Sequence, residues 1–285
     1  MRRRVKTVAG SIAALLLPIF AALAAQQKPA PALEIRFLDV GQGDAVLLRS
    51  EGRTALIDAG PSDDIVRRLR TLGVDTIDLL VASHNHADHI GGADAVLDSF
   101  PVRFYLDNHV PATTRIQQRV LERVDEKGVG YLAPSSRRVA LGSASLVVIP
   151  PPEHPAGDGQ NNRSVGILVE QGVFLALFTG DSEVEEINAM LSRDSLPDVA
   201  LLKAAHHGSR NGVSPAWLAR TRPEVVVISA GAGNPYRHPH TSALRYYCAS
   251  RRRVFRTDRN GEVTVTVAAD GSYQVTPRRG GTACE

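Results

Sequence analysis

The chain has 285 residues and a formal net charge of +3, but four of its positive charges belong to Arg2, Arg3, Arg4 and Lys6, and without these residues the net charge is −1. A strongly basic chain would indicate a nucleic-acid partner through neutralisation of phosphates, so the composition excludes that argument for the chain as a whole. The roughly 260 residues after the N-terminal segment are at the upper end of what one hydrophobic core supports, and no linker divides them. We therefore expect one domain.

The N-terminal segment has the three zones of a secretory signal peptide. Residues 1–6 are basic, residues 11–24 form an apolar run, and Ala22-Leu23-Ala24 is a small-x-small cleavage pattern. The run is too short and wrongly flanked for a transmembrane helix, although an uncleaved anchor is the alternative. We expect a signal peptide over 1–25, a linker over 26–32, no stable membrane anchor after cleavage, and a periplasmic or secreted protein.

Export bears on the two cysteines, Cys248 and Cys284. An oxidising compartment permits a disulfide between them, but neither their spacing nor their number requires one. The sequence leaves this bond and the oligomeric state open.

The first half of the chain is predicted to begin with strands and to continue with alternating helices and strands. Residues 33–40 alternate apolar and polar side chains, which is the period of a half-buried strand. Apolar runs and helical spacing then predict strands over 45–49, 54–57, 77–82 and 102–106, and helices over 64–72, 93–100 and 113–127. The run 77–82 is expected to be buried on both faces, and a histidine cluster starts two residues after it.

The second half continues the alternation. Strands are predicted over 146–149, 165–170, 173–178, 199–204, 225–229, 254–256, 262–267 and 272–277, and helices over 183–191, 215–221 and 242–251. The loop 150–162 has the length and composition that often border a site. Two β-rich halves with polar clusters at strand ends predict an α/β (α+β) domain over 33–277, with two sheets between helical layers and a tail over 278–285.

The segment His84-Asn85-His86-Ala87-Asp88-His89 places three histidines and one aspartate within six residues. A tight turn of this kind offers several ligand atoms to a metal. Neutral imidazole and carboxylate suit zinc, manganese or iron, and the absence of cysteine from the cluster argues against a closed structural zinc site. The cluster therefore predicts a metal centre.

This segment resembles the signature of the metallo-β-lactamase superfamily. Five companion motifs, in order between about residues 34 and 265, resemble the metal-dependent domain of ComEC-type DNA-uptake proteins: Asp39-Val40-Gly41-Gln42-Gly43-Asp44-Ala45, Leu177-Phe178-Thr179-Gly180-Asp181, Leu202-Lys203-Ala204-Ala205-His206-His207-Gly208-Ser209, Asn234-Pro235-Tyr236-Arg237-His238-Pro239 and Arg256-Thr257-Asp258-Arg259-Asn260-Gly261. The resemblance implies a four-layer αββα metallo-β-lactamase sandwich and a two-metal hydrolase.

The resemblance also implies the ligands. The expected set is His84 and His86 at the first metal, Asp88 and His89 at the second, Asp181 bridging both, and His206 or His207, with His206 preferred, completing the second site. We expect two divalent ions about 3.5 to 4 Å apart, which can hold a shared water as hydroxide. Zinc is the preferred metal and manganese is the alternative. Asp88 is counted among the catalytic residues as well.

One departure from the superfamily concerns the first metal. Many members place a further histidine between the first cluster and the bridging aspartate, whereas this chain has Asn161-Asn162-Arg163-Ser164, which offers amide and hydroxyl groups. His154, in the preceding loop, is the alternative ligand. The first metal is therefore expected to be weakly held or to bind a substrate oxygen directly.

Further residues are expected around the centre, where they orient ligands or contact substrate, with turn capping as the alternative role; these are Asp39, Gln42, Asp44, Asp58, Asn162, Ser164 and Ser209. His238 is expected to contact the substrate or donate a proton to its leaving group. The run Arg251-Arg252-Arg253 is most simply solvated surface charge, and steering of a polyanion is the alternative.

The leading functional hypothesis is an exported phosphodiesterase or nuclease-like enzyme acting on a phosphate ester such as DNA. The alternatives are a hydrolase of a phosphocholine ester, a cell-envelope ester or a β-lactam, and a non-catalytic, metal-stabilised binding protein. Serine hydrolase and nucleotide-triphosphatase functions lack support, because the sequence has no GxSxG elbow and no P-loop.

Overall fold

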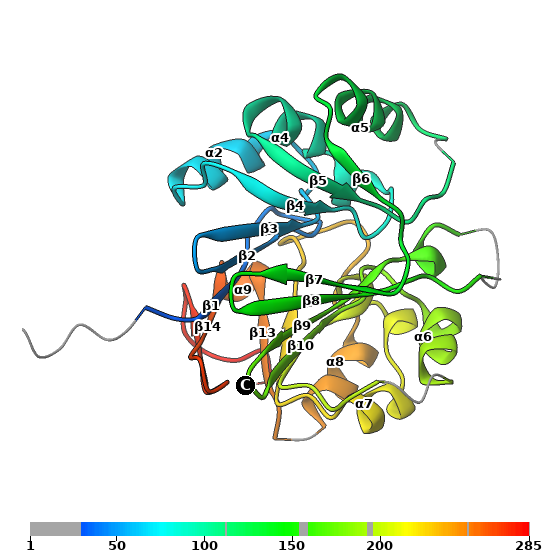
Figure 1. Cartoon of the computed structure of the whole chain (residues 1–285). Coiled ribbons are helices and arrows are strands. Elements are labelled where there is room, and N and C mark those ends of the chain that lie inside the picture. The colour runs from blue at the N-terminus through cyan, green and yellow to red at the C-terminus, as the bar shows by residue number, and fades with distance from the viewer. Residues whose placement is uncertain (1–29, 112, 154–158, 193–195, 250, 285) are drawn as a thin grey trace, which may run out of the picture. The chain divides into compact units, whose positions relative to one another are not determined.

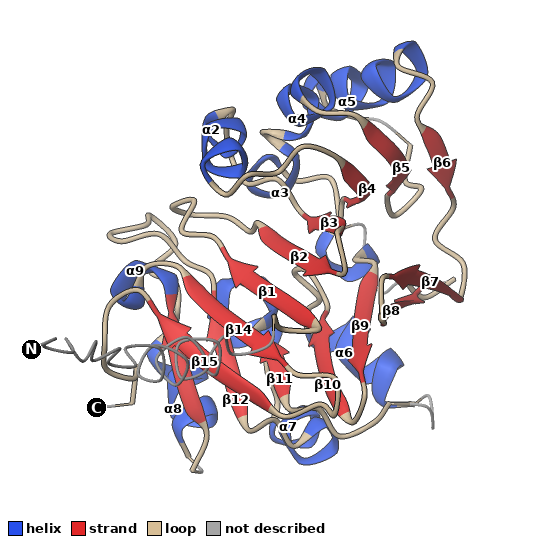
Figure 2. Cartoon of the chain, turned by 60° about the vertical axis from the view of Figure 1, so that its left-hand side comes forward, coloured by secondary structure: helices blue, strands red, loops and turns tan. Residues whose placement is uncertain are grey.

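The computed structural model describes residues 30–111, 113–153, 159–192, 196–249 and 251–284. Contacts divide the chain into two units, Met1–Ala30 and Pro31–Glu285, and the second unit is described below (Figures 1 and 2). The predicted signal peptide lies outside the described residues, so its cleavage stays a prediction. In the part of the chain that is described, no helix combines the length and apolar character needed to cross a membrane.

An eight-stranded mixed sheet is formed by the beginning and the end of this unit, in the order β15-β14-β1-β2-β3-β4-β5-β6. Its strands are β1 (Leu33–Phe37), β2 (Val46–Ser50), β3 (Arg53–Ile57), β4 (Ile77–Val81), β5 (Val102–Leu106), β6 (Gly130–Leu132), β14 (Val263–Val267) and β15 (Tyr273–Pro277). Pairing is antiparallel from β15 to β3 and parallel from β3 to β6.

A seven-stranded mixed sheet is formed by the middle of the chain, in the order β13-β12-β11-β10-β9-β8-β7. Its strands are β7 (Arg137–Leu141), β8 (Ala144–Ile149), β9 (Gly166–Gln171), β10 (Phe174–Phe178), β11 (Leu201–Lys203), β12 (Val225–Ile228) and β13 (Arg253–Arg256). The strands from β10 to β13 run parallel, so their carboxyl ends share one edge.

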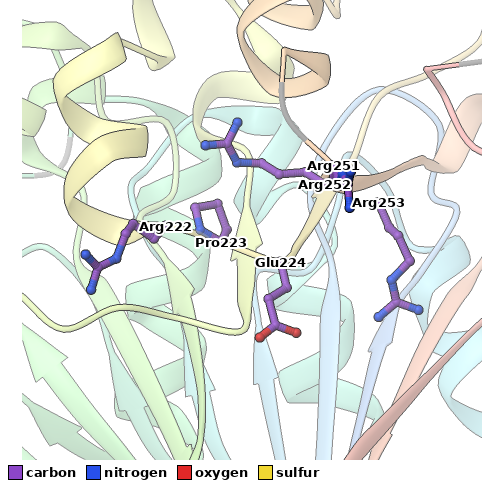
Figure 3. A pocket seen from close by; sticks show the side chains of 6 residues that line it. All are labelled: Arg222, Pro223, Glu224, Arg251, Arg252 and Arg253. Carbon is purple, nitrogen blue, oxygen red and sulfur yellow. The ribbon is translucent and has the colours of Figure 1, made fainter.

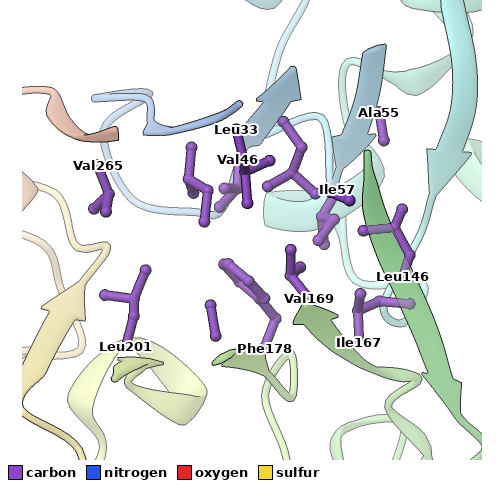
Figure 4. Close-up of a cluster of buried hydrophobic side chains, with 14 of the residues drawn as sticks. Leu33, Val46, Ala55, Ile57, Leu146, Ile167, Val169, Phe178, Leu201 and Val265 are labelled. Atoms are coloured by element: carbon purple, nitrogen blue, oxygen red, sulfur yellow. The ribbon is translucent and has the colours of Figure 1, made fainter. Parts of the chain in front are cut away.

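The alternation of side chains along the strands creates the layers. In β3, Ala55 and Ile57 join the core between the sheets, whereas Leu56 packs against helices on the other face. Figure 4 shows side chains of the two sheets facing each other in this inner core. The rings of Phe37 and Phe178 stack across it, with centroids 5.8 Å apart.

Helices cover both outer faces. The eight-stranded sheet packs against α2 (Asp64–Thr71), α4 (Ala93–Ser99) and α5 (Arg115–Glu126), and the seven-stranded sheet against α6 (Val184–Leu191), α7 (Pro215–Thr221) and α8 (Thr241–Cys248). Short turns are α3 (Ala87–Ile90), α9 (Thr257–Asn260), η1 (Asn161–Arg163), η2 (Ala205–Gly208) and η3 (Arg210–Gly212). The predicted four-layer αββα sandwich is confirmed.

The C-terminal segment expected as a tail is attached to this sandwich. Arg278 N–H donates to the Glu262 carbonyl and Ala283 N–H to the Val254 carbonyl, each over 2.8 Å. Cys284 is bonded to Cys248 at the end of α8, which settles the question that the sequence left open. The disulfide closes a loop with a sequence separation of 36 residues.

Candidate metal centre

The predicted cluster and its companions meet at the carboxyl ends of strands from both sheets. His84 follows β4 of the eight-stranded sheet, while Asp181 follows β10 and His207 follows β11 of the seven-stranded sheet. Loops after parallel strands are free to carry polar groups, because the strand ends leave the packed core there.

Four groups converge most closely. Asp88, His89, Asp181 and His207 each offer a ligand atom, and these atoms all lie within 4.8 Å of one another. Asp181 Oδ2 is 3.3 Å from His89 Nε2 and 3.3 Å from His207 Nε2, and His207 Nε2 is 3.2 Å from Asp88 Oδ2. Both Nε2 atoms are buried without a hydrogen-bond partner among the described residues. Two imidazoles and two carboxylates suit a divalent transition metal.

Asp58 determines how the His89 ring is turned. Its Oδ1 accepts the Ser83 backbone N–H at 2.7 Å, and its Oδ2 lies 2.8 Å from His89 Nδ1 and accepts the Ser83 hydroxyl at 2.8 Å. Because a carboxylate oxygen only accepts, His89 Nδ1 carries a proton, and Nε2 is the nitrogen that faces the centre and would bind a metal in exchange for its own proton. Asp58 thus holds the His89 ring with Nδ1 outward, through a 2.8 Å contact.

The geometry favours His207 over His206, the reverse of the preference from sequence. His207 Nδ1 lies 3.0 Å from the Ser229 carbonyl oxygen, which only accepts, so Nδ1 carries a proton and Nε2 is the nitrogen left to bind a metal in exchange for its own proton. His206 Nδ1 is instead 3.2 Å from Glu183 Oε1, and its Nε2 is 3.9 Å from Asp181 Oδ2. The side chains of His206 and His207 point in different directions because both residues adopt left-handed backbone angles, with φ of 48° and 52°.

His84 and His86 are the two histidines expected at the first metal. His84 Nε2 and His86 Nδ1 are 3.0 Å apart, and His84 Nδ1 is 3.2 Å from the Ser83 hydroxyl. Complete burial, and then the neighbouring His89, lower the pKa of His84 well below its ordinary value. The ring is therefore neutral and able to act as a ligand. His154, the alternative third ligand, lies outside the described residues.

Lys203 is a component that the sequence did not single out. Its ammonium is 2% exposed, pairs with the carboxylate of Asp44, donates to the Gly180 carbonyl at 3.0 Å and lies 3.7 Å from Asp181 Oδ1. Asp44 in turn lies 3.7 Å from His89 Nδ1 and 3.6 Å from His207 Nδ1. A buried cation and carboxylate thus lie directly behind the ligand rings.

Buried carboxylates dominate the electrostatics. Burial lowers the pKa of His207, but Asp181 and Asp44 outweigh that effect and raise it to about 9. In the same way Asp181 and Asp58 outweigh the burial of His89 and raise its pKa well above the usual range. Carboxylates that retain protons on buried imidazoles also attract a metal cation to the same position.

Ser164 and Asn162, two residues expected around the centre, accept hydrogen bonds from the backbone that follows β10. The Ser164 hydroxyl accepts the Asp181 backbone N–H at 3.2 Å, which fixes the backbone that carries the Asp181 carboxylate. Asn162 Oδ1 instead accepts the backbone N–H groups of Glu183, at 3.1 Å, and Glu186 at the start of α6. Asn162 therefore caps a helix.

The loop after β1 supplies the other expected residues. Gly43 allows this loop to approach the cluster, because a Cβ there would lie 2.3 Å from the Asp88 carbonyl oxygen. The Asp44 backbone N–H donates to that oxygen at 3.1 Å, and Gln42 Oε1 accepts from Gly231 N–H at 3.2 Å. Asp39 belongs to neither of the two groups of converging ligand atoms among the described residues, which are Asp88, His89, Asp181 and His207, and Asp44, Asp58 and His89.

A pocket of 340 Å³ opens over the centre and is lined by Gln42, His86, Ala87, Asp88, Asn161, Asp181, His206, His207, Tyr236 and His238. Its outer wall is held by Asn234, whose amide bonds both the N–H and the carbonyl of His238, at 2.9 and 2.6 Å. Burial, and then the neighbouring histidines, lower the pKa of His238 to about 4. The predicted His238 thus lines the pocket as a neutral ring, whereas Ser209 accepts from Asn211 N–H at 3.4 Å within its own turn.

The arginine run lies away from this pocket. Arg251, Arg252 and Arg253 line a separate pocket of 520 Å³ with Arg222, Pro223 and Glu224 (Figure 3). This pocket is at the amino ends of β12 and β13, whereas the metal ligands follow carboxyl ends of strands. A strand of four residues spans about 13 Å. The position favours the surface-charge interpretation over steering into the centre.

The fold and the site define a metal-binding protein with an αββα sandwich. Residues 38–232 match the family model of the Metallo-beta-lactamase superfamily, and the chain therefore belongs to this superfamily. The donor set fits a two-metal centre.

Two curated relatives are much longer proteins. The chain is 27% identical over 252 residues to ComE operon protein 3 of Bacillus subtilis (strain 168), covering 81% of this chain and 32% of the relative. It is 28% identical over 264 residues to Recombination protein 2 of Haemophilus influenzae, covering 90% and 32%. The chain thus spans about a third of the length of these relatives, and the predicted relation to competence proteins is confirmed.

A solved structure supports the fold independently. The metallo-beta-lactamase fold protein YhfI from Bacillus subtilis aligns with a TM-score of 0.53 and 11% identity, covering 86% of this chain and 100% of that one. This alignment supports the fold, and the family match with the converging His and Asp side chains supports the predicted metal-dependent hydrolase of this superfamily.

Proposed function

We propose that the chain is a two-metal phosphodiesterase of nuclease-like type, acting on DNA or another phosphate ester. The observation that carries the proposal is the unequal pair of metal positions. One position has Asp88, His89, Asp181 and His207 converging on it, whereas two histidines, His84 and His86, are the imidazoles at the other among the described residues. A metal with few protein nitrogens keeps coordination positions for a substrate oxygen. The name of one relative, Recombination protein 2, is consistent with a nucleic-acid substrate.

Two divalent cations in this centre would lower the pKa of a water molecule and neutralise negative charge on the phosphoryl group. Zinc is the preferred metal and manganese is the alternative. The residues of the chain prepare the site for them. Asp58 and the Ser229 carbonyl hold the rings of His89 and His207 with Nε2 inward. Lys203 pairs with Asp44 behind these rings.

His238 contributes a hydrogen bond in this proposal. With a pKa of about 4, its ring lacks the second proton of a general acid at pH 7. The neutral imidazole still offers one N–H and one lone pair to a substrate in the pocket. We therefore assign it to substrate positioning in place of the proton donation considered from sequence.

The test is hydrolysis by the purified, metal-loaded protein of single-stranded DNA, bis-p-nitrophenyl phosphate and nitrocefin. We expect turnover of the two phosphodiesters, and turnover of nitrocefin alone would overturn the proposal. Asp181→Ala and His86→Ala should abolish activity, whereas His109→Ala, an exposed histidine outside the pocket, should not change it. Folded, metal-loaded wild-type protein without turnover of any substrate would favour a binding protein.

We also propose that the protein is exported to the periplasm or the medium and cleaved after Ala24 or Ala25. The disulfide between Cys248 and Cys284 is consistent with an oxidising compartment. N-terminal sequencing of protein recovered from cell fractions tests this. Recovery of the uncleaved chain from the cytoplasm alone would contradict the proposal.

A further inference from the structure

Among the residues that the structure describes, no third histidine accompanies His84 and His86, and Asn161 lines the same pocket as His86. Asn161 shares the pocket wall with His86 and Asp181. It belongs to η1, where it directly precedes Asn162 and lies three residues before Ser164. Asn162 and Ser164 are the residues of this segment that the sequence predicted around the centre. A carboxamide offers one oxygen acceptor, so the question is where that oxygen points.

The orientation of the amide is set by Glu183. Asn161 Nδ2 donates to Glu183 Oε1 at 3.0 Å. Because a carboxylate only accepts, the NH2 group must face Glu183, and Oδ1 is turned to the opposite side. Asn161 Oδ1 is buried and has no hydrogen-bond partner among the described residues. Leaving a buried acceptor unpaired costs about 1–3 kcal/mol, so a ligand for it is expected.

The backbone around Asn161 is fixed independently of its side chain. The Asn161 carbonyl accepts the Ser164 hydroxyl at 2.9 Å and the Ser164 N–H at 3.2 Å. Asn162 is held by its capping contacts with α6, and Ser164 by its bond to Asp181. The segment that presents Asn161 Oδ1 is therefore tied to the same backbone that presents the bridging carboxylate.

We propose that Asn161 Oδ1 is the third protein ligand of the first metal, beside His84 Nε2 and His86 Nδ1. This inference rests on the two-metal centre of the proposed function but not on its substrate. An amide oxygen is a harder ligand than an imidazole nitrogen, and oxygen donors suit manganese better than they suit zinc. The first position should therefore favour Mn²⁺ relative to Zn²⁺ more strongly than the same position with a histidine in place of Asn161.

Metal binding tests the proposal directly. The metal-free full chain is titrated with Mn²⁺ and separately with Zn²⁺, and stoichiometry and affinity are measured by calorimetry and elemental analysis. Wild type should bind two ions, and Asn161→Ala should bind the first-position ion about 10- to 100-fold more weakly while the second keeps its affinity. Asn161→His should lower the Kd for Zn²⁺ relative to Mn²⁺ by about tenfold or more. The matched control is Asn188→Ala, an exposed asparagine on α6.

Retention of both ions with wild-type affinity in Asn161→Ala would overturn the inference. Undiminished binding of the second ion shows that the variant is folded. Should Asn161→Ala fail to fold, the Asn161→His variant decides, because an unchanged preference between Zn²⁺ and Mn²⁺ contradicts a ligand at this position. Two bound ions with the expected preference, but no phosphodiester hydrolysis, would overturn the proposed function and leave this inference standing.

Discussion

Each ligand imidazole that converges on Asp181 has a partner that selects the nitrogen facing the centre. For His89 this partner is Asp58, and for His207 it is the Ser229 carbonyl. Asp58 adopts a left-handed backbone conformation, with φ of 59°. Such a conformation costs on the order of 1–3 kcal/mol and persists where the surroundings demand it. Ligand geometry is thus set by residues that do not themselves touch the metal position.

Asp58→Asn should weaken metal binding at the second position about 10- to 100-fold, because an amide nitrogen opposite His89 Nδ1 cannot accept its proton. Competition with a chromophoric chelator measures the affinity. Asp98→Asn, which alters a surface carboxylate paired with Arg123, serves as the control. Equal affinities in the two variants would contradict an orienting role for Asp58.

Lys203→Met should destabilise the metal-free protein by about 3–5 kcal/mol, because it leaves the buried Asp44 carboxylate without its counter-charge. Urea unfolding at pH 7 gives the free energy. The matched control is Lys127→Met, which removes an exposed ion pair with Asp98 and should cost at most about 1 kcal/mol. A similar loss of unfolding free energy in both variants would show that the Lys203–Asp44 pair contributes no more to stability than an exposed ion pair.

The sequence predicted the ligand cluster from spacing alone, but it could not select among residues that only the tertiary structure brings together. Lys203 ends an apolar strand, and nothing nearby in sequence shows that Asp44 lies beside it. Asn161 and Asn162 are adjacent asparagines, and which of them faces the pocket depends on the packing of α6. His206 and His207 differ only through their backbone angles and partners.

At the level of elements, long periodic segments were predicted well and short edge segments were not. Predicted strand 54–57 and helix 64–72 correspond to β3 and α2 within one residue at each end. β6 and β7 were missed because β6 has three residues with a glycine, and β7 opens with Arg137 and Arg138, so neither shows a sustained apolar period. Both lie at sheet edges, where one neighbour suffices.

The disulfide links α8 to the segment after β15 and should stabilise the fold mainly by restricting the unfolded chain. Cys248→Ser combined with Cys284→Ser opens a loop with a sequence separation of 36 residues, for which a loss of about 3–4 kcal/mol is expected. In a chain of this size the Tm should fall by roughly 5–10 °C, as measured by scanning calorimetry. Reduced wild type is the control and should melt with the double variant; an unchanged Tm in both would contradict the prediction.

On the scale of the whole molecule, the metal centre joins the two sheets. His84, His86, Asp88 and His89 follow β4 of one sheet, and Asp181 and His207 follow β10 and β11 of the other. The core between the sheets brings these strand ends together, and the metal position sits where the two layers open to solvent. Composition and element order predicted this sandwich, because alternating strands and helices with buried faces have few packing solutions.

Chelation of bound metal should therefore lower the Tm. A ligand that binds only the folded state at a hundred times its Kd contributes about 2.7 kcal/mol, which corresponds to roughly 5–10 °C here. Scanning calorimetry before and after chelation measures the effect. Asp181→Ala should show a far smaller metal-dependent shift, and equal shifts in the variant and wild type would place the bound metal elsewhere.

The distribution of the ligands along the chain also orders events during biosynthesis. His84 to His89 leave the ribosome almost a hundred residues before Asp181, and His207 follows later still. A nascent chain therefore carries an incomplete, oxygen- and nitrogen-rich ligand cluster that no sandwich yet surrounds. The complete centre arises only when the second sheet has been made and docked, so the metal it acquires is the one available where folding is completed.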